Sequence, residues 1–97
     1  MMHETHLVTE QTSAFLAANF RNTELGLIRI ARNLGLGDFD DVKLVEHLRR
    51  VILSTPSTDI KIQGKNFYLT SAKYRAVLTI NRSSLGIITA KPLGKVL

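Results

Sequence analysis

Four side chains in the last third of the chain have the types that cleave RNA without a metal: Lys65, Tyr68, Arg75 and Thr89. Cations stabilise the charge that develops on the phosphorus, while two further groups take the 2′-hydroxyl proton and protonate the leaving group. No histidine lies in this region of the sequence. The same residues also suit an ordinary strand, because Thr and Tyr are good strand formers and an exposed Arg is solvated. A metal-independent ribonuclease is therefore one hypothesis, with no catalytic residue assigned.

The charge of the chain is divided unevenly between its two parts. Residues 1–59 contain six Lys and Arg against eight Asp and Glu, whereas residues 60–97 contain seven Lys and Arg and no acid. This asymmetry indicates a polyanionic partner such as nucleic acid, although it also suits a face that only keeps the protein in solution. The cations would bind phosphate, and a tyrosine could stack on an unpaired base. The residues expected to contact nucleic acid are Lys61, Lys65, Asn66, Tyr68, Lys73, Tyr74, Arg75, Arg82 and Lys91.

Length and composition exclude several classes of protein. The 97 residues suffice for one small domain, and a homodimer would enlarge its core. The absence of cysteine excludes disulfides and thiolate zinc sites. No apolar run reaches the length of a membrane span, and the mixed, acidic start does not read as a signal peptide, so we expect a cytoplasmic protein. His3, His6 and His47 lie at no ligand spacing, with His47 expected on a helix surface, so no metal or cofactor is expected.

Three helices are expected in the first half of the chain. A short one spans Thr12 to Phe20, and the segment "ELGLIRIARNL" forms a second, capped by Asn22 or Thr23 and ended by Gly35. Its apolar stripe is Leu27, Ile28, Ala31 and Leu34. The third helix begins at Asp38 or Asp40 and ends before Pro56. Its apolar face is Leu44, Val45, Leu48, Val51 and Ile52.

From Ile60 onward the apolar period changes to two, which is typical of strands. "IKIQ" and "NFYLT" flank a two-residue hairpin turn at Gly64-Lys65, and "YRAVLTIN" and "LGIITA" flank the turn "RSS". One face of "YRAVLTIN" carries Tyr74, Ala76, Leu78 and Ile80, and the other Arg75, Val77, Thr79 and Asn81. Because Val77 competes with Leu78 and Ile80 for the inside, the register stays open.

These elements predict an α+β fold with three N-terminal helices followed by a three- or four-stranded antiparallel sheet. Residues 1–97 form a single domain, made of an N-terminal arm and helix (1–21), a helical pair (22–55) and a basic antiparallel sheet (60–93). The helices would cover one sheet face and leave many cations on the other. A winged helix is disfavoured, because its recognition helix would begin with Asp40-Asp41, which phosphates repel.

Two resemblances extend this interpretation. "RAVLTINRSSLGIITAKPL" is similar to the final hairpin of barnase- and colicin-like ribonucleases. "GKNFY", "LTIN" and "IITA", behind "NTELGLIRI", resemble domain-of-unknown-function family 3781 over roughly Asn22 to Leu93. That resemblance implies a bacterial or phage setting and no known activity. The chain departs from the family pattern at Arg82-Ser83-Ser84, where an aromatic turn is usual.

The favoured hypothesis is a small basic binding module that contacts nucleic acid, RNA in preference, or a nucleoprotein such as a nuclease. A phage or mobile-element accessory, for instance an anti-CRISPR inhibitor of a host CRISPR nuclease, is one form of this hypothesis. The alternatives are the metal-independent ribonuclease, as a toxin, and a homodimeric structural protein with a solubilising basic face. Salt-sensitive binding, cleavage in EDTA, or neither would separate the three classes.

Overall fold

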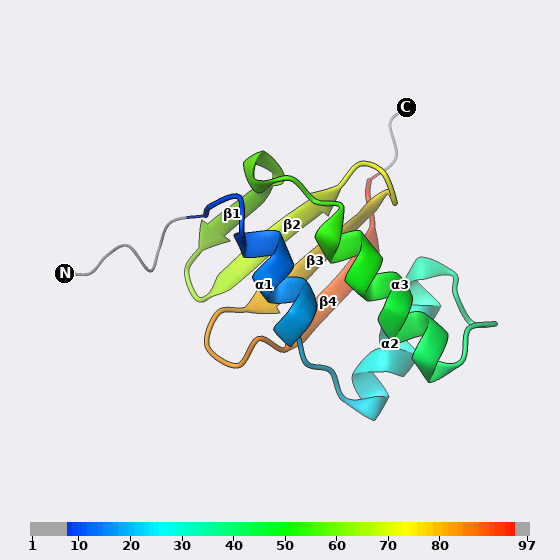
Figure 1. The fold of residues 1–97 in the computed structure, drawn as a ribbon. Helices are drawn as coiled ribbons and strands as arrows, with labels where there is room; N and C mark the ends of the chain where they lie inside the picture. Colours follow the sequence, from blue (N-terminus) through cyan, green and yellow to red (C-terminus); the bar gives the residue numbers. More distant parts are fainter. Residues whose placement is uncertain (1–7, 95–97) are drawn as a thin grey trace.

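The computed structural model describes residues 8–94, and Figure 1 shows the arrangement of their elements. The helices are α1 (Thr12–Asn19), α2 (Glu24–Leu34) and α3 (Asp41–Leu53), followed by a 3-10 turn, η2 (Ser57–Asp59). The strands are β1 (Ile60–Gln63), β2 (Asn66–Ser71), β3 (Ala76–Asn81) and β4 (Ile87–Pro92), which form one antiparallel sheet in the order β1-β2-β3-β4.

This arrangement corrects the expected fold in three respects. The described sheet has four strands, so the three-stranded alternative is wrong. The segment after Pro56 forms the 3-10 turn η2, an element that the expected fold lacked. The helices do not all lie over one face of the sheet, because α2 lies along β4.

Local sequence signals set the helix ends. The Thr23 hydroxyl accepts a hydrogen bond from the Gly26 amide at 3.0 Å, and the Asp40 carboxylate accepts one from the Lys43 amide at 2.8 Å. Each bond satisfies an amide that has no partner inside the helix. Gly35 ends α2 in the left-handed region at φ 71°, a conformation that glycine adopts without strain. Of the candidate caps, Thr23 and Asp40 are therefore confirmed.

Helices α1 and α3 lie side by side on one face of the sheet (Figure 1). Burying apolar side chains between two layers is the main stabilising contribution to a domain of this size. The largest fully buried apolar side chains of this core come from both helices and the two central strands: Leu16, Leu44, Leu48, Ile52, Leu69, Leu78 and Ile80. The helical spacing in α3 is thus confirmed, and Leu78 and Ile80, not Val77, face the inside.

Helix α2 covers the outer edge of β4. The Asn33 side-chain amide donates a hydrogen bond to the Ala90 carbonyl at 3.2 Å, and the segment before α2 pairs with the start of β4 through Arg21 and Gly86. Both helices expected within residues 22–55 are present, but α3 packs chiefly on α1 and α2 chiefly on β4, with smaller contact between α2 and α3. The expected stripe of α2 is also corrected, since Ile30 is buried and Ile28 is 53% exposed.

Two of the hairpin turns of the described sheet differ in how well the sequence predicts them. Gly64 has φ +60°, as the predicted two-residue turn requires, and the predicted pairing of β1 with β2 is present. The turn between β2 and β3 is longer than expected, because Arg75 takes φ +53° and the Ser71 hydroxyl accepts a hydrogen bond from the Tyr74 amide. Tyr74 and Arg75 thus lie in a turn, and not on the strand to which their alternation assigned them.

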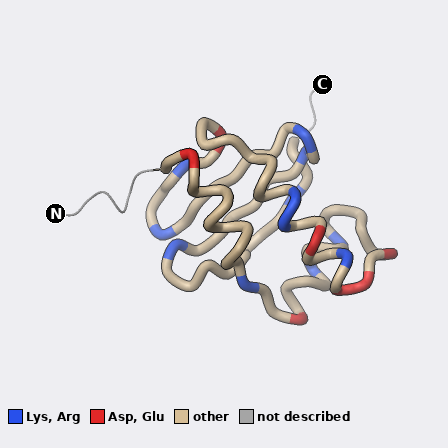
Figure 2. Tube along the Cα trace, in the orientation of Figure 1, with Lys and Arg blue, Asp and Glu red and all other residues tan. Residues whose placement is uncertain are grey.

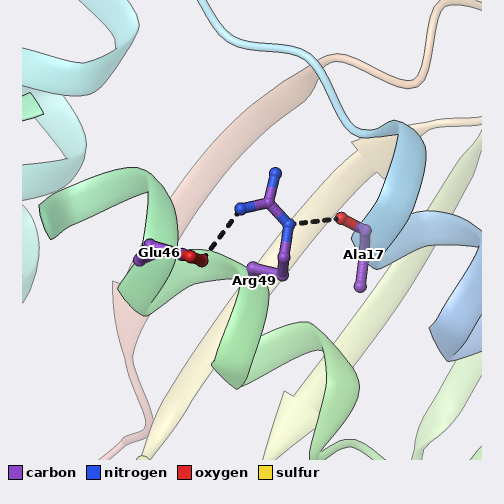
Figure 3. A network of polar contacts seen from close by, with 3 residues as sticks. All are labelled: Ala17, Glu46 and Arg49. Atoms are coloured by element: carbon purple, nitrogen blue, oxygen red, sulfur yellow. Dashed lines mark hydrogen bonds and ion pairs between the residues drawn. The ribbon is translucent and has the colours of Figure 1, made fainter. Parts of the chain in front are cut away.

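Arg49 connects the two helices that cover the sheet (Figure 3). Its Nε donates a hydrogen bond to the Ala17 carbonyl of α1 at 3.0 Å, and its Nη1 lies 2.9 Å from the Glu46 carboxylate one turn earlier in α3. The guanidinium carbon lies 5.3 Å from the centre of the Phe20 ring. The contacts to Ala17 and Phe20 join separate segments, whereas the contact to Glu46 stays within one helix.

Replacing Arg49 by methionine should lower the free energy of unfolding by about 1 kcal/mol. Methionine keeps the apolar stem and removes the hydrogen bond to Ala17 and the cation over Phe20. Glu46→Gln is the control, and it should change stability by less than about 0.5 kcal/mol because exposed ion pairs contribute little. Urea unfolding measures the change in the free energy of unfolding for both variants, provided that the m-value stays the same. Equal effects of the two substitutions would assign the contribution to the ion pair.

Candidate nucleic-acid interface

The pairing register places a row of polar side chains on the sheet face that α1 and α3 leave uncovered. On the core face, cross-strand neighbours are Ile60, Leu69, Leu78 and Ala90, all buried. Each next position along its strand points to the opposite face, because side chains alternate. We call this opposite surface the open face. Its middle row is Lys61, Tyr68, Thr79 and Thr89, of which Thr79 is buried between its neighbours.

Tyr68 lies near the middle of the open face and has a cation directly beside it. Lys61 is its cross-strand partner on β1 and is exposed, while Thr79 on β3 is its partner on the other side. The Tyr68 ring is half-buried, and its hydroxyl lies 3.4 Å from the side-chain amide nitrogen of Asn66 on the same strand. Lys61 and Tyr68 are thus cross-strand neighbours, an arrangement that suits stacking on a base next to a phosphate contact.

One end of the open face carries Lys65 and Arg82, which we call the first cation pair. The Arg82 guanidinium donates a hydrogen bond to the Gly64 carbonyl at 2.8 Å, and the Arg82 amide donates one to the Lys65 carbonyl at 2.8 Å. These bonds hold the β3–β4 loop against the β1–β2 turn. A polar hollow of about 480 Å³ lies here, lined by Gly64, Lys65, Asn81, Arg82 and Ser83. The Asn81 side-chain oxygen fixes the loop by accepting hydrogen bonds from the backbone amides of Ser83 and Ser84.

The other end of the sheet carries Lys73, Arg75 and Lys91, which we call the second cation group. Lys73 and Arg75 are exposed in the β2–β3 turn, and Lys91 is exposed on β4 opposite Val77. The Leu93 amide donates a hydrogen bond to the Arg75 carbonyl at 2.8 Å, so the end of β4 lies against the turn. Six of the nine expected contact residues are cations, and the structure divides them between the middle row and the two ends.

Tyr74 does not belong to the open face. Its ring contacts the His47 ring of α3 edge-on, at 5.3 Å between centroids, and the Lys73 ammonium lies 5.5 Å from its centre. Tyr74 is half-buried, and its face is already engaged by these two neighbours. Of the two tyrosines expected to stack on a base, Tyr68 therefore remains the candidate.

The charge of the described residues is separated in space as well as in sequence. From residue 60 to residue 94 there are six Lys and Arg and no acid. Five of the seven acids between residues 8 and 94 fall within residues 24–46, and Figure 2 shows most of the red segments at the α2–α3 end of the molecule. A polyanion approaching the open face thus meets cations without a competing carboxylate on the strands themselves.

The four residues considered for RNA cleavage do not surround one point. Lys65 and Arg75 lie in the turns at opposite ends of β2, about 17 Å or more apart at 3.3 Å per strand residue. Tyr68 and Thr89 share a row but are separated by β3, which sets their strands about 10 Å apart. One phosphate cannot contact all four, so this set does not form a single ribonuclease centre.

His47 lies between two aromatic rings, and this corrects its expected place on the helix surface. Its ring is 5.7 Å from Phe39 and 5.3 Å from Tyr74, edge-on to both. Burial lowers the pKa of His47 below its ordinary value of 6.5, and the neighbouring Arg50 lowers this pKa further. No sequence pattern indicated this contact, because Phe39 and Tyr74 are distant from each other along the chain.

The stability of the protein should fall as the pH drops below about 6.5, because the unfolded His47 then binds a proton that the folded one resists. The loss ends below the lowered pKa of the folded state, where both states are protonated. Subtracting the unfolding free energy of His47→Leu from that of the wild type, at each pH from about 5 to 8, isolates this contribution, since His3 and His6 remain in both proteins. An identical pH profile for both proteins would contradict it.

Residues 8–94 contain no group of three or more His, Asp or Glu placed to hold a metal ion. No helix within this range has the length and apolar character needed to cross a membrane. His3 and His6, for which no ligand role was expected, lie outside the described residues.

Comparison with known proteins yields one match. No curated protein and no solved structure matches the chain. A family model described as "Protein of unknown function (DUF3781)" matches residues 14–91. This range includes all of β1, β2 and β3, the first cation pair and the whole middle row of the open face. The chain therefore belongs to the family DUF3781, as the spaced segments "GKNFY", "LTIN" and "IITA" indicated.

Proposed function

We propose that this protein binds single-stranded nucleic acid, RNA in preference, on the open face of its sheet. The observation that carries the proposal is the position of Tyr68 beside Lys61, with cations at both ends of the same sheet and no acid from residue 60 to residue 94. A backbone that follows β2 meets the first cation pair, the middle row and the second cation group in turn.

Single strands are favoured over duplexes because the open face offers an aromatic ring. An unpaired base exposes its flat surface to such a ring, whereas a base inside a duplex does not. Thr89 and Asn66 add hydroxyl and amide groups on the same face, which suit the 2′-hydroxyl of RNA. The proposal places the protein in the cytoplasm, a reducing compartment to which a chain without cysteine is suited.

Fluorescence anisotropy with a labelled single-stranded RNA, in EDTA, tests the proposal. Affinity should fall steeply when salt is raised from about 50 to 200 mM, because phosphate contacts release counterions. The DNA strand of the same sequence should bind more weakly, and the RNA duplex more weakly still. Tyr68→Leu, which keeps an apolar side chain in the strand, should lower affinity for the single strand about tenfold and leave the duplex almost unchanged.

A denaturing gel of the same samples separates binding from cleavage. Intact RNA supports the binding proposal, whereas discrete cleavage in EDTA would replace it by a metal-independent ribonuclease. No change in anisotropy and no cleavage would mean that the basic face contacts a protein, and it would overturn the proposal.

A further inference from the structure

A small pocket lies where α2 meets the outer edge of β4. Its volume is about 170 Å³, and its lining includes Gly26, Arg29 and Asn33 of α2 and Ile88 and Thr89 of β4. We call it the α2–β4 pocket. Pockets for drug-sized ligands measure about 300 to 1,000 Å³, so this one suits a single planar ring system better than a whole nucleotide. Because Thr89 also belongs to the middle row, the pocket extends the open face past its last strand.

An apolar wall of the pocket comes from a β-bulge in β4. Thr79 pairs with Thr89 and Ile80 pairs with Ile87, so Ile88 has no partner on β3. Such an extra residue bends the strand and redirects a side chain, and bulges are frequent beside functional sites. Ile88 is 53% exposed and lines the pocket. An apolar surface next to a few polar groups is the usual composition of a ligand site.

Arg29 provides the charge of the pocket. Its side chain is exposed, and it forms no hydrogen bond or ion pair with any residue from 8 to 94. Its neighbours three and four residues away on α2 include no acid: Leu25, Gly26, Arg32 and Asn33. The five N–H donors of this guanidinium are therefore available to a ligand.

The hydrogen-bonding groups of the pocket favour guanine among the four bases of RNA. A guanidinium has donors alone, and guanine offers it two adjacent acceptors, O6 and N7, for a pair of parallel hydrogen bonds. Adenine has a donor beside N7, and uracil separates its two carbonyls by a donor. Cytosine also has two adjacent acceptors, but its single ring covers less of the apolar wall. The Asn33 side-chain nitrogen donates to the Ala90 carbonyl at 3.2 Å, which leaves the Asn33 oxygen to accept from guanine N1–H or N2–H.

We propose that the α2–β4 pocket binds one guanine base of the RNA strand on the open face, and that Arg29 selects it. This inference rests on the proposed function, because the strand on the open face delivers the base. β2 and β4 lie about 10 Å apart, a distance that one nucleotide spans from its phosphate to the far edge of its base. A backbone that follows β2 thus stacks one base on Tyr68 and extends another across β3 into the pocket.

Fluorescence anisotropy with two labelled RNAs, each about ten nucleotides long, tests the inference. One strand contains uridine alone, and the other has a single guanosine at its centre. Because uridines on both sides let the strand shift along the face, the guanosine can reach the pocket. We expect the guanosine strand to bind about tenfold more tightly, whereas strands with adenosine or cytidine in its place should bind like the uridine strand. In NMR spectra of the labelled protein, the amide shifts that differ between the two strands should fall in residues 26–33 and 87–90.

Two variants identify the selecting residue. Arg29→Lys keeps the positive charge but loses the planar pair of donors, so it should lower the affinity for the guanosine strand to about that of the uridine strand. Arg32→Lys is the matched control, because Arg32 is exposed on the same helix and does not line the pocket. This control should keep the preference for guanosine.

The possible outcomes separate this inference from the proposed function. Equal binding of all strands, a preference for another base, or a guanosine preference that survives Arg29→Lys would overturn the inference and leave the proposed function standing. Binding of no strand would overturn the proposed function and the inference with it.

Discussion

Leu48→Ala should lower the free energy of unfolding by about 3 kcal/mol, the largest effect that we expect from one substitution in this protein. The Leu48 side chain is fully buried on α3, in the layer between the helices and the two central strands. Truncation removes apolar contacts and leaves a cavity, because neighbours on three different elements cannot all move to fill it. The free energy of unfolding of a whole domain is only about 5 to 15 kcal/mol, so this loss is a large share of it.

Urea unfolding followed by circular dichroism measures the effect as a shift in midpoint at constant m-value. Val42→Ala is the matched control, since Val42 lies on the same helix but is 75% exposed. It should change stability by less than about 0.5 kcal/mol. A small effect of Leu48→Ala, or a large effect of Val42→Ala, would show that the apolar face of α3 is not the one that packs on the sheet.

Local features of the fold could be predicted from the sequence because the forces that set them act within a few residues. Thr23 and Asp40 cap their helices through bonds to amides three residues on. Gly35 and Gly64 take positive φ where the helix end and the hairpin turn require it. The apolar spacing of α3 was sufficient to identify its buried face, because Leu44, Leu48 and Ile52 all contact one continuous layer.

Features set by contacts between distant segments could not be predicted from the sequence. Ile28 fits an apolar stripe as well as Ile30 does, and only the docking of α2 along β4 decides which of them is buried. Tyr74 continues a strand alternation, but its ring packs on His47 and the chain turns at Arg75. Here a tertiary contact overrides the local pattern.

The candidate interface shows the same division. An acid-free stretch of sequence predicted a basic half, and residue types alone suggested cations and tyrosines as contacts. The register decides which of them are neighbours: it sets Lys61 beside Tyr68, and the contact of Tyr74 with His47 removes Tyr74 from the face. Because register follows from the buried face, the core residues determine the arrangement of the surface residues.

Replacing three cations of the sheet half together should reduce the affinity for single-stranded RNA about a hundredfold at about 0.1 M salt. The variant carries Lys61→Gln, Lys65→Gln and Lys91→Gln, all exposed residues that lie in the middle row or at the two ends of the sheet. Each phosphate contact on a single strand contributes about 0.7 to the slope of log K against log salt, so three contacts contribute about 2. The slope should therefore become shallower by that amount.

A second triple variant separates the proposed interface from net charge. Arg32→Gln, Lys43→Gln and Arg50→Gln remove the same three charges from exposed positions on α2 and α3. If the open face binds RNA, this control should keep most of the affinity and an almost unchanged salt slope, because charges beyond about 10 Å are screened at this ionic strength. Equal losses in the two variants would mean that RNA is attracted by overall charge, and the open face would lose its role as a defined site.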